Sequence, residues 1–486
     1  MFYRVRFQIK LVMLFFVVVL VQLVFSGIAS AQMALATGWE VDETQAGRKT
    51  AIFTAFKSGS VDADRAGLDT FFDKYYFARW TRPENTGQVQ QFVREFLSQD
   101  LRDAAGNARE YLLAKSFDSL KKIAADNNAT PSSRYNAILA IGQLTQREPA
   151  SRGNPPTPYV QALPYLLGEY QKTENPKFIQ LGALIGIVRF AEIGITDEGL
   201  KNTTIPNLFI EIIQSGKPKQ DGNKEDQEMT DWFRSHALDG LGALKSVGTN
   251  GQVIKVLSEV IENNEETIEM RTYAAKIFGE LNFADSDTTL NNQQYQQLGT
   301  SLITLMKATA DSQLQMVTQL RNKALVAKGG IPSVDITGIS STALEPEFAM
   351  LTPEQQLEVT GAVQSVKSNI LNVTHGMRGA RLTGTAIAGI LPMLPGDDPV
   401  AAKINSVVKL ITPLFKVLDE GLPEEITRQR LTSGMTDSMS EPYSGSSGRT
   451  TTKPKEQQLK VNFTAIRDAL QKMSDELSAI IAGSGV

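Results

Sequence analysis

The segment RYNAILAIGQL (residues 134–144) has three later variants in the chain: FIQLGALIGIV (178–188), FRSHALDGLGAL (233–244) and RTYAAKIFGEL (271–281). Aligned on a shared glycine, the copies place Gly142, Gly186, Gly242 and Gly279 at separations of 44, 56 and 37 residues. Small or apolar residues recur in each copy at steps of three and four, which is the period of a helix with one buried face. A period near 40 residues is typical of stacked repeats, in which neighbouring units bury each other's apolar faces.

A second helical segment precedes each copy and completes the unit. These segments are apolar-periodic and of helical length: 110–126, 159–173, 203–215 and 252–263. With ALPYLL in a first helix and R-x-x-A-A-x-x-x-G-x-L in a second, residues 108–310 resemble the HEAT repeat family. The resemblance implies an all-α fold, a HEAT-like α-α solenoid of about five helical pairs, whose second helices line a concave surface.

Three arginines occupy equivalent places in three of the copies. Arg134, Arg234 and Arg271 each fall three residues before the small residue that opens the buried stripe, and the second copy has Phe178 there. The HEAT resemblance implies that a basic residue at this place stacks between repeats, where it pairs with acids or carbonyls of the neighbouring turn. The alternative is recognition of an acidic protein partner, because a guanidinium offers bidentate contacts to carboxylates.

The first 31 residues have the features of a secretory signal peptide. Three basic residues precede an apolar run over 11–25, and an Ala-Ser-Ala end follows at 29–31, so cleavage is expected after Ala31. The alternative is an uncleaved membrane anchor, since the run is little shorter than a spanning helix. We therefore expect an exported, periplasmic or cell-envelope protein with no integral membrane segment after cleavage.

The composition narrows the classes of chemistry. The chain has no cysteine, which excludes disulfides and thiol chemistry. Removing the signal lowers Lys plus Arg from 49 to 46 against 53 acids, so the mature net charge is about −7 and disfavours nucleic acid as a partner. His236 and His375 have no metal-binding or catalytic motif around them and are interpreted as structural, so we expect no catalytic residues, metal or cofactor.

An aromatic cluster marks the region from 32 to 107, before the repeats. Tyr75, Tyr76 and Trp80 stand in the sequence FFDKYYFARW (71–80). They are candidates for a stacking platform, but the favoured interpretation is a hydrophobic cap that seals the first repeat. Just upstream, Asp62 and Asp64 resemble the start of a calcium loop that departs from the pattern at later positions, and a helix N-cap is the favoured role for one of them.

The pattern changes after the repeats, which are assigned to 108–327. Residues 328–353 and 432–455 are rich in Gly, Pro, Ser and Thr and are predicted to be linkers, the second of them disordered. Apolar residues in 354–431 and 456–486 recur at heptad spacing, which favours helices packed at shallow angles. A bundle within one chain is the favoured arrangement, and a homo-oligomer through these heptad helices is the alternative.

The expected function is that of an exported, non-catalytic scaffold or adaptor that binds a protein partner through the repeat surface. Two other classes stay open: a structural envelope component that self-associates through its C-terminal helices, and a carboxylate-based lyase or hydrolase built on a helical-repeat fold. The step from fold to role is an analogy, because one architecture serves many activities.

Overall fold

The computed structural model describes residues 39–61, 64–149, 155–216, 224–283, 290–327, 353–379, 388–420 and 462–483. Within these ranges the chain is almost entirely helical, which confirms the predicted all-α class; a short antiparallel hairpin pairs β1 (Thr145–Arg147) with β2 (Thr157–Pro158). The predicted signal peptide (1–31), Asp62, the second predicted linker (432–455) and all of the first predicted linker (328–353) except its last residue lie outside the described residues.

The N-terminal region consists of short helices around an aromatic core. Its elements are η1 (Glu43–Arg48), α2 (Lys49–Lys57), α3 (Arg65–Phe71), η2 (Phe72–Tyr76), η3 (Ala78–Trp80), η4 (Pro83–Gln88), α4 (Val89–Glu95) and η5 (Phe96–Leu101). The rings meet mostly edge to face, as Phe77 and Trp80 do with centroids 5.4 Å apart. Tyr111 on the following helix, α5 (Gly106–Ala125), joins this core against Phe56 and Phe72, so the region packs onto α5.

Four helices contain or end at the shared glycines, and we call them the glycine helices: α6 (Pro131–Gln143), α8 (Lys177–Ile193), α10 (Lys224–Leu244) and α12 (Ile268–Phe278). Each follows a preceding helix: α5 (Gly106–Ala125), α7 (Ala162–Gln171), α9 (Ile205–Ser215) and α11 (Gln252–Glu262). Shorter turns, η6 (Leu200–Thr204) and η7 (Thr249–Gly251), lead into α9 and α11. Every glycine helix packs against its own preceding helix and against the neighbouring glycine helices.

The shared glycines lie where glycine helices cross. A Cβ added to Gly142 would lie 2.6 Å from the Cα of Gly186, so α6 and α8 approach backbone to backbone. A Cβ on Gly242 would lie 2.9 Å from side-chain atoms of Ile277 and Glu280 next to Gly279. At the α6–α8 crossing a larger residue would push the two helices apart because the contact is between backbones, whereas at Gly242 the ends of the two facing side chains can move aside.

The stack of glycine helices continues past α12 into α14 (Pro353–Arg378). A Cβ on Gly279 would lie 2.1 Å from the carbonyl oxygen of His375 and 2.9 Å from the nitrogen of Gly376, so Gly376 takes the place of a fifth shared glycine. The helix α13 (Asn292–Ala327) packs on both α11 and α14, as a preceding helix does. The predicted linker at 328–353 therefore does not separate these helices in space.

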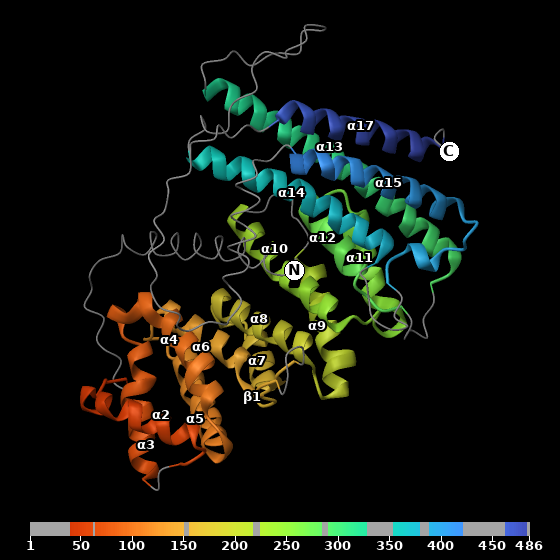
Figure 1. The fold of residues 1–486 in the computed structure, drawn as a ribbon. Coiled ribbons are helices and arrows are strands. Elements are labelled where there is room, and N and C mark those ends of the chain that lie inside the picture. The colour runs from red at the N-terminus through yellow and green to blue at the C-terminus, as the bar shows by residue number, and fades with distance from the viewer. Residues whose placement is uncertain are drawn as a thin grey trace.

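Helices α13, α14, α15 (Pro399–Glu420) and α17 (Phe463–Ala482) lie side by side at the C-terminal end, with η9 (Leu391–Met393) leading into α15 (Figure 1). Nearly all described heptad positions of α14, α15 and α17 are buried, among them Val366, Ile370, Ile404, Val407, Leu470 and Leu477, and Val400 is partly buried. In this structure α17 packs on α13 and α15 of its own chain.

Candidate functional site

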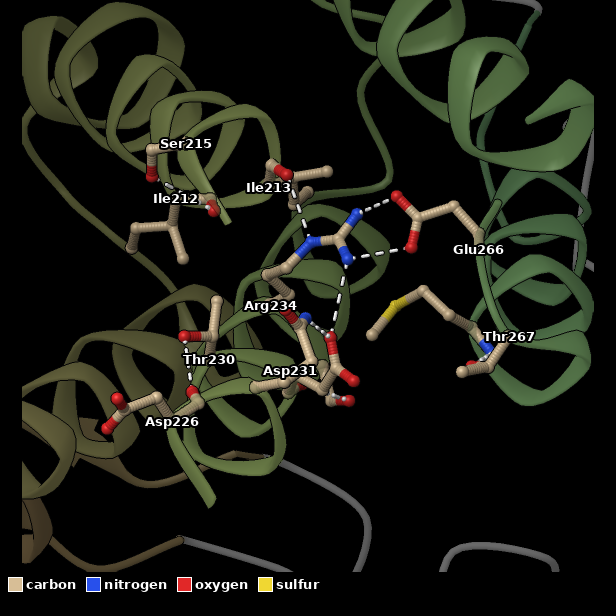
Figure 2. A network of polar contacts seen from close by, with 12 residues as sticks. Ile212, Ile213, Ser215, Asp226, Thr230, Asp231, Arg234, Glu266 and Thr267 are labelled. Atoms are coloured by element: carbon tan, nitrogen blue, oxygen red, sulfur yellow. Dashed lines mark hydrogen bonds and ion pairs between the residues drawn. The ribbon is translucent and has the colours of Figure 1, made fainter. Parts of the chain in front are cut away.

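Arg234 lies at the centre of a buried polar network that joins α9, α10 and the loop before α12 (Figure 2). Its side chain is fully buried, and Glu266 is 6% exposed. The Nε group donates to the carbonyl oxygen of Ile213 at 3.0 Å, and Nη1 and Nη2 donate to the two carboxylate oxygens of Glu266 at 2.8 and 2.5 Å. Asp231, one turn earlier on α10, accepts a longer bond of 3.4 Å from Nη1.

The other two predicted arginines bond in the same way to their own preceding helices. Arg134 Nε donates to the carbonyl of Ala124 at 3.0 Å, and Arg271 Nε donates to that of Ile261 at 2.9 Å. Each carbonyl lies in the last turn of its helix, where backbone acceptors lack partners within the helix. Burial lowers the pKa of both guanidinium groups, and nearby carboxylates act in the opposite direction.

The second copy, which has no arginine, reaches a similar result with other side chains. Gln180 Nε2 donates to the carbonyl of Lys172, the residue that ends α7, at 2.9 Å. The ring centroid of Phe178, at the arginine's position, lies 5.7 Å from the guanidinium of Arg134, so the ring face meets that charge. Because Arg134, Arg234 and Arg271 are all directed into the chain, the structure offers none of their guanidinium groups to a protein partner.

The aromatic candidates Tyr76 and Trp80 are fully buried, and Tyr75 is half-buried. The Tyr76 hydroxyl donates to Asp100, and burial raises the pKa of this tyrosine well above its ordinary value. The Arg79 guanidinium covers the Tyr76 ring at 4.9 Å from its centroid. The geometry is that of a packed core under the first repeat, because rings at this depth are covered by other described side chains and not by solvent.

Asp64 caps α3, since its side chain accepts a hydrogen bond from the backbone N–H of Gly67 at 2.8 Å. This confirms the N-cap interpretation for that residue. In the described part of the chain, no group of three or more His, Cys, Asp or Glu side chains is arranged to hold a metal ion.

Two hollows lie on or near α9, and neither suits a small organic ligand. One, bounded by Ile213, Val256 and Glu266, has a volume of about 10 Å³, roughly the space of one water molecule. The other is a shallow depression on the outer side of α9, lined by Asn207, Ile210, Glu211, Gln214 and Ser215. Ligand pockets are usually enclosed and largely apolar, so the exposed helix faces are better candidates for binding than these hollows.

A stripe of partly exposed side chains on α10 lies opposite the buried arginine. Trp232 and His236 stand two residues before and after Arg234, and each is turned about 160–200° around the helix from it. The ring of Trp232 lies 6.3 Å from that of His236, whose Nδ1 is 3.8 Å from Asp239. Met229, one turn before, is 44% exposed and is among the most exposed large apolar side chains of the described residues.

The stripe continues onto Lys276 of α12 and onto Glu280, which lies just after the end of that helix. Glu280 lies beside Gly242 and forms an ion pair of 2.7 Å with Lys276. His375 on α14 lies near this pair: burial lowers its pKa, and Glu280 opposes that effect while Lys276 adds to it. We call the surface formed by Met229, Trp232, His236, Asp239, Lys276 and Glu280 the α10–α12 face.

The α10–α12 face was not predicted from the sequence, although a signal existed. Met229, Trp232, His236 and Asp239 recur at steps of three and four on the side of α10 opposite the arginine that the repeat alignment directs inward.

Among the described residues no helix combines the length and the apolar character needed to cross a membrane.

No protein-family model, curated protein or solved structure gives a significant match to this chain.

Proposed function

We propose that this chain is an exported HEAT-like α-solenoid that acts as a non-catalytic scaffold and binds a protein partner through the α10–α12 face. The observation that carries the proposal is the pairing on α10 of a buried anchor with a stripe that is partly exposed and includes the exposed Met229. Arg234 fixes the rotation of α10 through its bonds to α9 and to Glu266, so Met229 is held on the outside and Trp232 on the same, partly exposed side of the helix. Tryptophan and methionine are enriched at protein interfaces.

The packing of the helices supports the solenoid part of the proposal. Five glycine helices, from α6 to α14 with Gly376 included, each pack on the next, and each packs on a preceding helix. An arginine bond to the preceding helix recurs in three of these pairs. Such stacks create extended surfaces suited to gripping another macromolecule.

Export is the remaining part of the proposal and rests on residues 1–31 of the sequence. Expression in the native host followed by fractionation and N-terminal sequencing tests it directly. We expect an envelope fraction whose protein begins at Gln32. A cytosolic protein that retains all 31 residues would contradict the export.

The binding proposal is tested by chemical cross-linking in intact cells and identification of the cross-linked protein. The test variant is Met229→Asp with Trp232→Ala, and the matched control is Glu211→Ala with Gln214→Ala on the exposed side of α9. Helical content and Tm are compared first to establish that both variants fold. A buried tryptophan at an interface typically contributes at least about 2 kcal/mol, so we expect the test variant to weaken binding roughly 30-fold.

The control variant should retain the partner at the wild-type level. Equal recovery of the partner by both variants would show that binding, if present, uses another surface. Loss of the partner from the control variant alone would show that the binding site is on the outer side of α9.

A further inference from the structure

The helix α17 is attached to the rest of the fold by a seam of apolar side chains. Its residues Phe463, Ile466, Leu470, Met473, Leu477 and Ile480 are buried, and they recur at steps of three and four. The surface that they cover is formed by α13 and α15. We call this surface the α17 groove.

Two polar contacts set the position of α17 in the α17 groove. The hydroxyl of Ser474, which is 5% exposed, donates to Asp311 of α13. The ammonium of Lys403 on α15 lies 3.4 Å from the carbonyl oxygen of Ile481. Because Ser474 is buried beside the apolar seam, a shifted helix would leave its hydroxyl without this acceptor, and the contact therefore favours one register.

The covalent connection does not restrict α17 to the groove of its own chain. Residues 421–461, 41 in all, separate the end of α15 from the residue that caps α17. At no more than about 3.6 Å per residue, whatever its conformation, this connection permits any separation up to roughly 150 Å. The interactions in the α17 groove are thus the same whether the helix belongs to one chain or to its neighbour.

The bundle that forms the groove contains polar atoms that lack hydrogen-bond partners among the described residues. On α13, Gln313 is 1% exposed and Arg321 is 6% exposed, and within the described ranges neither Gln313 Oε1 nor Arg321 Nε is paired. Unpaired buried polar atoms destabilise the packed state relative to one in which water reaches them. These two atoms lower the stability of the bundle, and any opening of the bundle would expose the apolar surface of the α17 groove.

We infer that the α17 groove also accepts α17 from a second copy of this chain, so that two copies exchange their C-terminal helices. The exchanged dimer keeps every interaction of the closed chain in the groove, including Ser474 with Asp311, and forgoes only the advantage of the intramolecular connection. Exchange of an identical element is a low-cost route to a dimer. The exchanged dimer becomes the main form when the concentration of the protein approaches the effective concentration of α17 at the groove of its own chain. For a helix on a flexible connection this effective concentration is about millimolar or lower.

The absence of cysteine from the sequence makes a direct test possible. Asp311→Cys and Ser474→Cys are prepared as separate full-length variants, of which one carries an affinity tag. The two proteins are mixed at concentrations rising to about 1 mM, the range of tethered modules, and gently oxidised. A disulfide between the tagged and untagged chains forms only where α17 of one copy lies on α13 of the other. The mixed dimer is identified on non-reducing gels and by peptide mapping.

Two controls accompany the mixture. In the first, Lys472→Cys replaces Ser474→Cys; the side chain of Lys472 is 79% exposed on the outer side of α17 and reports random collisions. In the second, both cysteines are placed in one chain at high dilution, where an internal disulfide shows that positions 311 and 474 are adjacent.

We expect the internal disulfide at high dilution and, as concentration rises, at least about ten times more mixed dimer with Ser474→Cys than with Lys472→Cys. The exchange is refuted if the internal disulfide forms but the mixture never exceeds the Lys472→Cys background. Failure of the internal disulfide would also overturn it, because α17 would then not occupy the groove even within one chain.

Discussion

Replacing Arg234 by methionine removes the cation from a fully buried ion pair while keeping a side chain of similar length. The carboxylate of Glu266 is then left in the interior without its two strongest donors, and the carbonyl of Ile213 no longer receives the bond from Nε. Asp231 offers no compensation, because it is itself an acceptor. We therefore expect Arg234→Met to be the most destabilising of the three arginine substitutions.

The magnitude follows from the kinds of hydrogen bond and ion pair that each substitution removes. Removing one partner of a buried ion pair costs about 3–5 kcal/mol, and an unpaired backbone carbonyl adds about 1 kcal/mol. Arg134 and Arg271 each donate one bond to a carbonyl, so their replacement by methionine is expected to cost about 1–3 kcal/mol. Replacing Arg234 and Glu266 together should recover most of the stability, since an apolar pair of similar volume is tolerated in such places.

The assay is urea unfolding followed by circular dichroism at 222 nm, with the free energy of unfolding compared between variants at constant slope. Arg467→Met on the exposed side of α17 is the surface control and should change stability by no more than about 0.5 kcal/mol. A decrease below about 1 kcal/mol for Arg234→Met would refute the assignment of Arg234 as the anchor of α10. So would a double variant less stable than Arg234→Met alone.

Three further predictions follow from the same structure. Gly142→Ala places a Cβ 2.6 Å from Gly186 and should destabilise the protein by about 1–3 kcal/mol. Gly168→Ala, where no described atom lies within 4 Å, should be neutral or stabilising by up to about 1 kcal/mol. Thermal unfolding of both variants measures the difference, and equal effects on Tm would contradict the close crossing of α6 and α8. Burial lowers the pKa of His375 in the folded state below its ordinary value of 6.5. As the pH falls, the unfolded chain therefore binds the proton first, and the free energy of unfolding decreases below about pH 6.5. His375→Gln should lose less stability than wild type between about pH 7 and pH 5, and parallel pH profiles of Tm for the two proteins would rule this out. Trp232→Ala should leave Tm within about 2 °C of wild type, because the side chain is partly exposed on the α10–α12 face, and a large drop in Tm would show that Trp232 belongs to the core.

Local pattern was enough to predict much of the fold. The periods of three and four residues located α5 to α12 and the heptad helices, because the apolar spacing of a helix specifies which of its sides is buried. The N-cap at Asp64 was equally local, since a cap depends on a few consecutive residues. In each of these cases the interacting groups are neighbours along the chain.

The sequence pattern did not identify Gly376 as a fifth shared glycine. The segment around it carries no arginine at the equivalent position and follows the long stretch between α13 and α14, so its likeness to the earlier copies is weak. Its role depends on α12, nearly 100 residues away, whose Gly279 meets it backbone to backbone. Contacts of that range have no periodic signature.

The amino-acid pattern alone indicates helices with defined buried faces, in which glycine and arginine recur at matched places. The roles of those places became visible only in the packed fold. It directed Arg134, Arg234 and Arg271 inward to carbonyls of the preceding helices, buried Tyr76 and Trp80, and left Met229 and Trp232 on the outer side of α10. The physical reason is that the spacing of residues sets the face of a helix on which a side chain lies, whereas its exposure depends on which other helices cover that face.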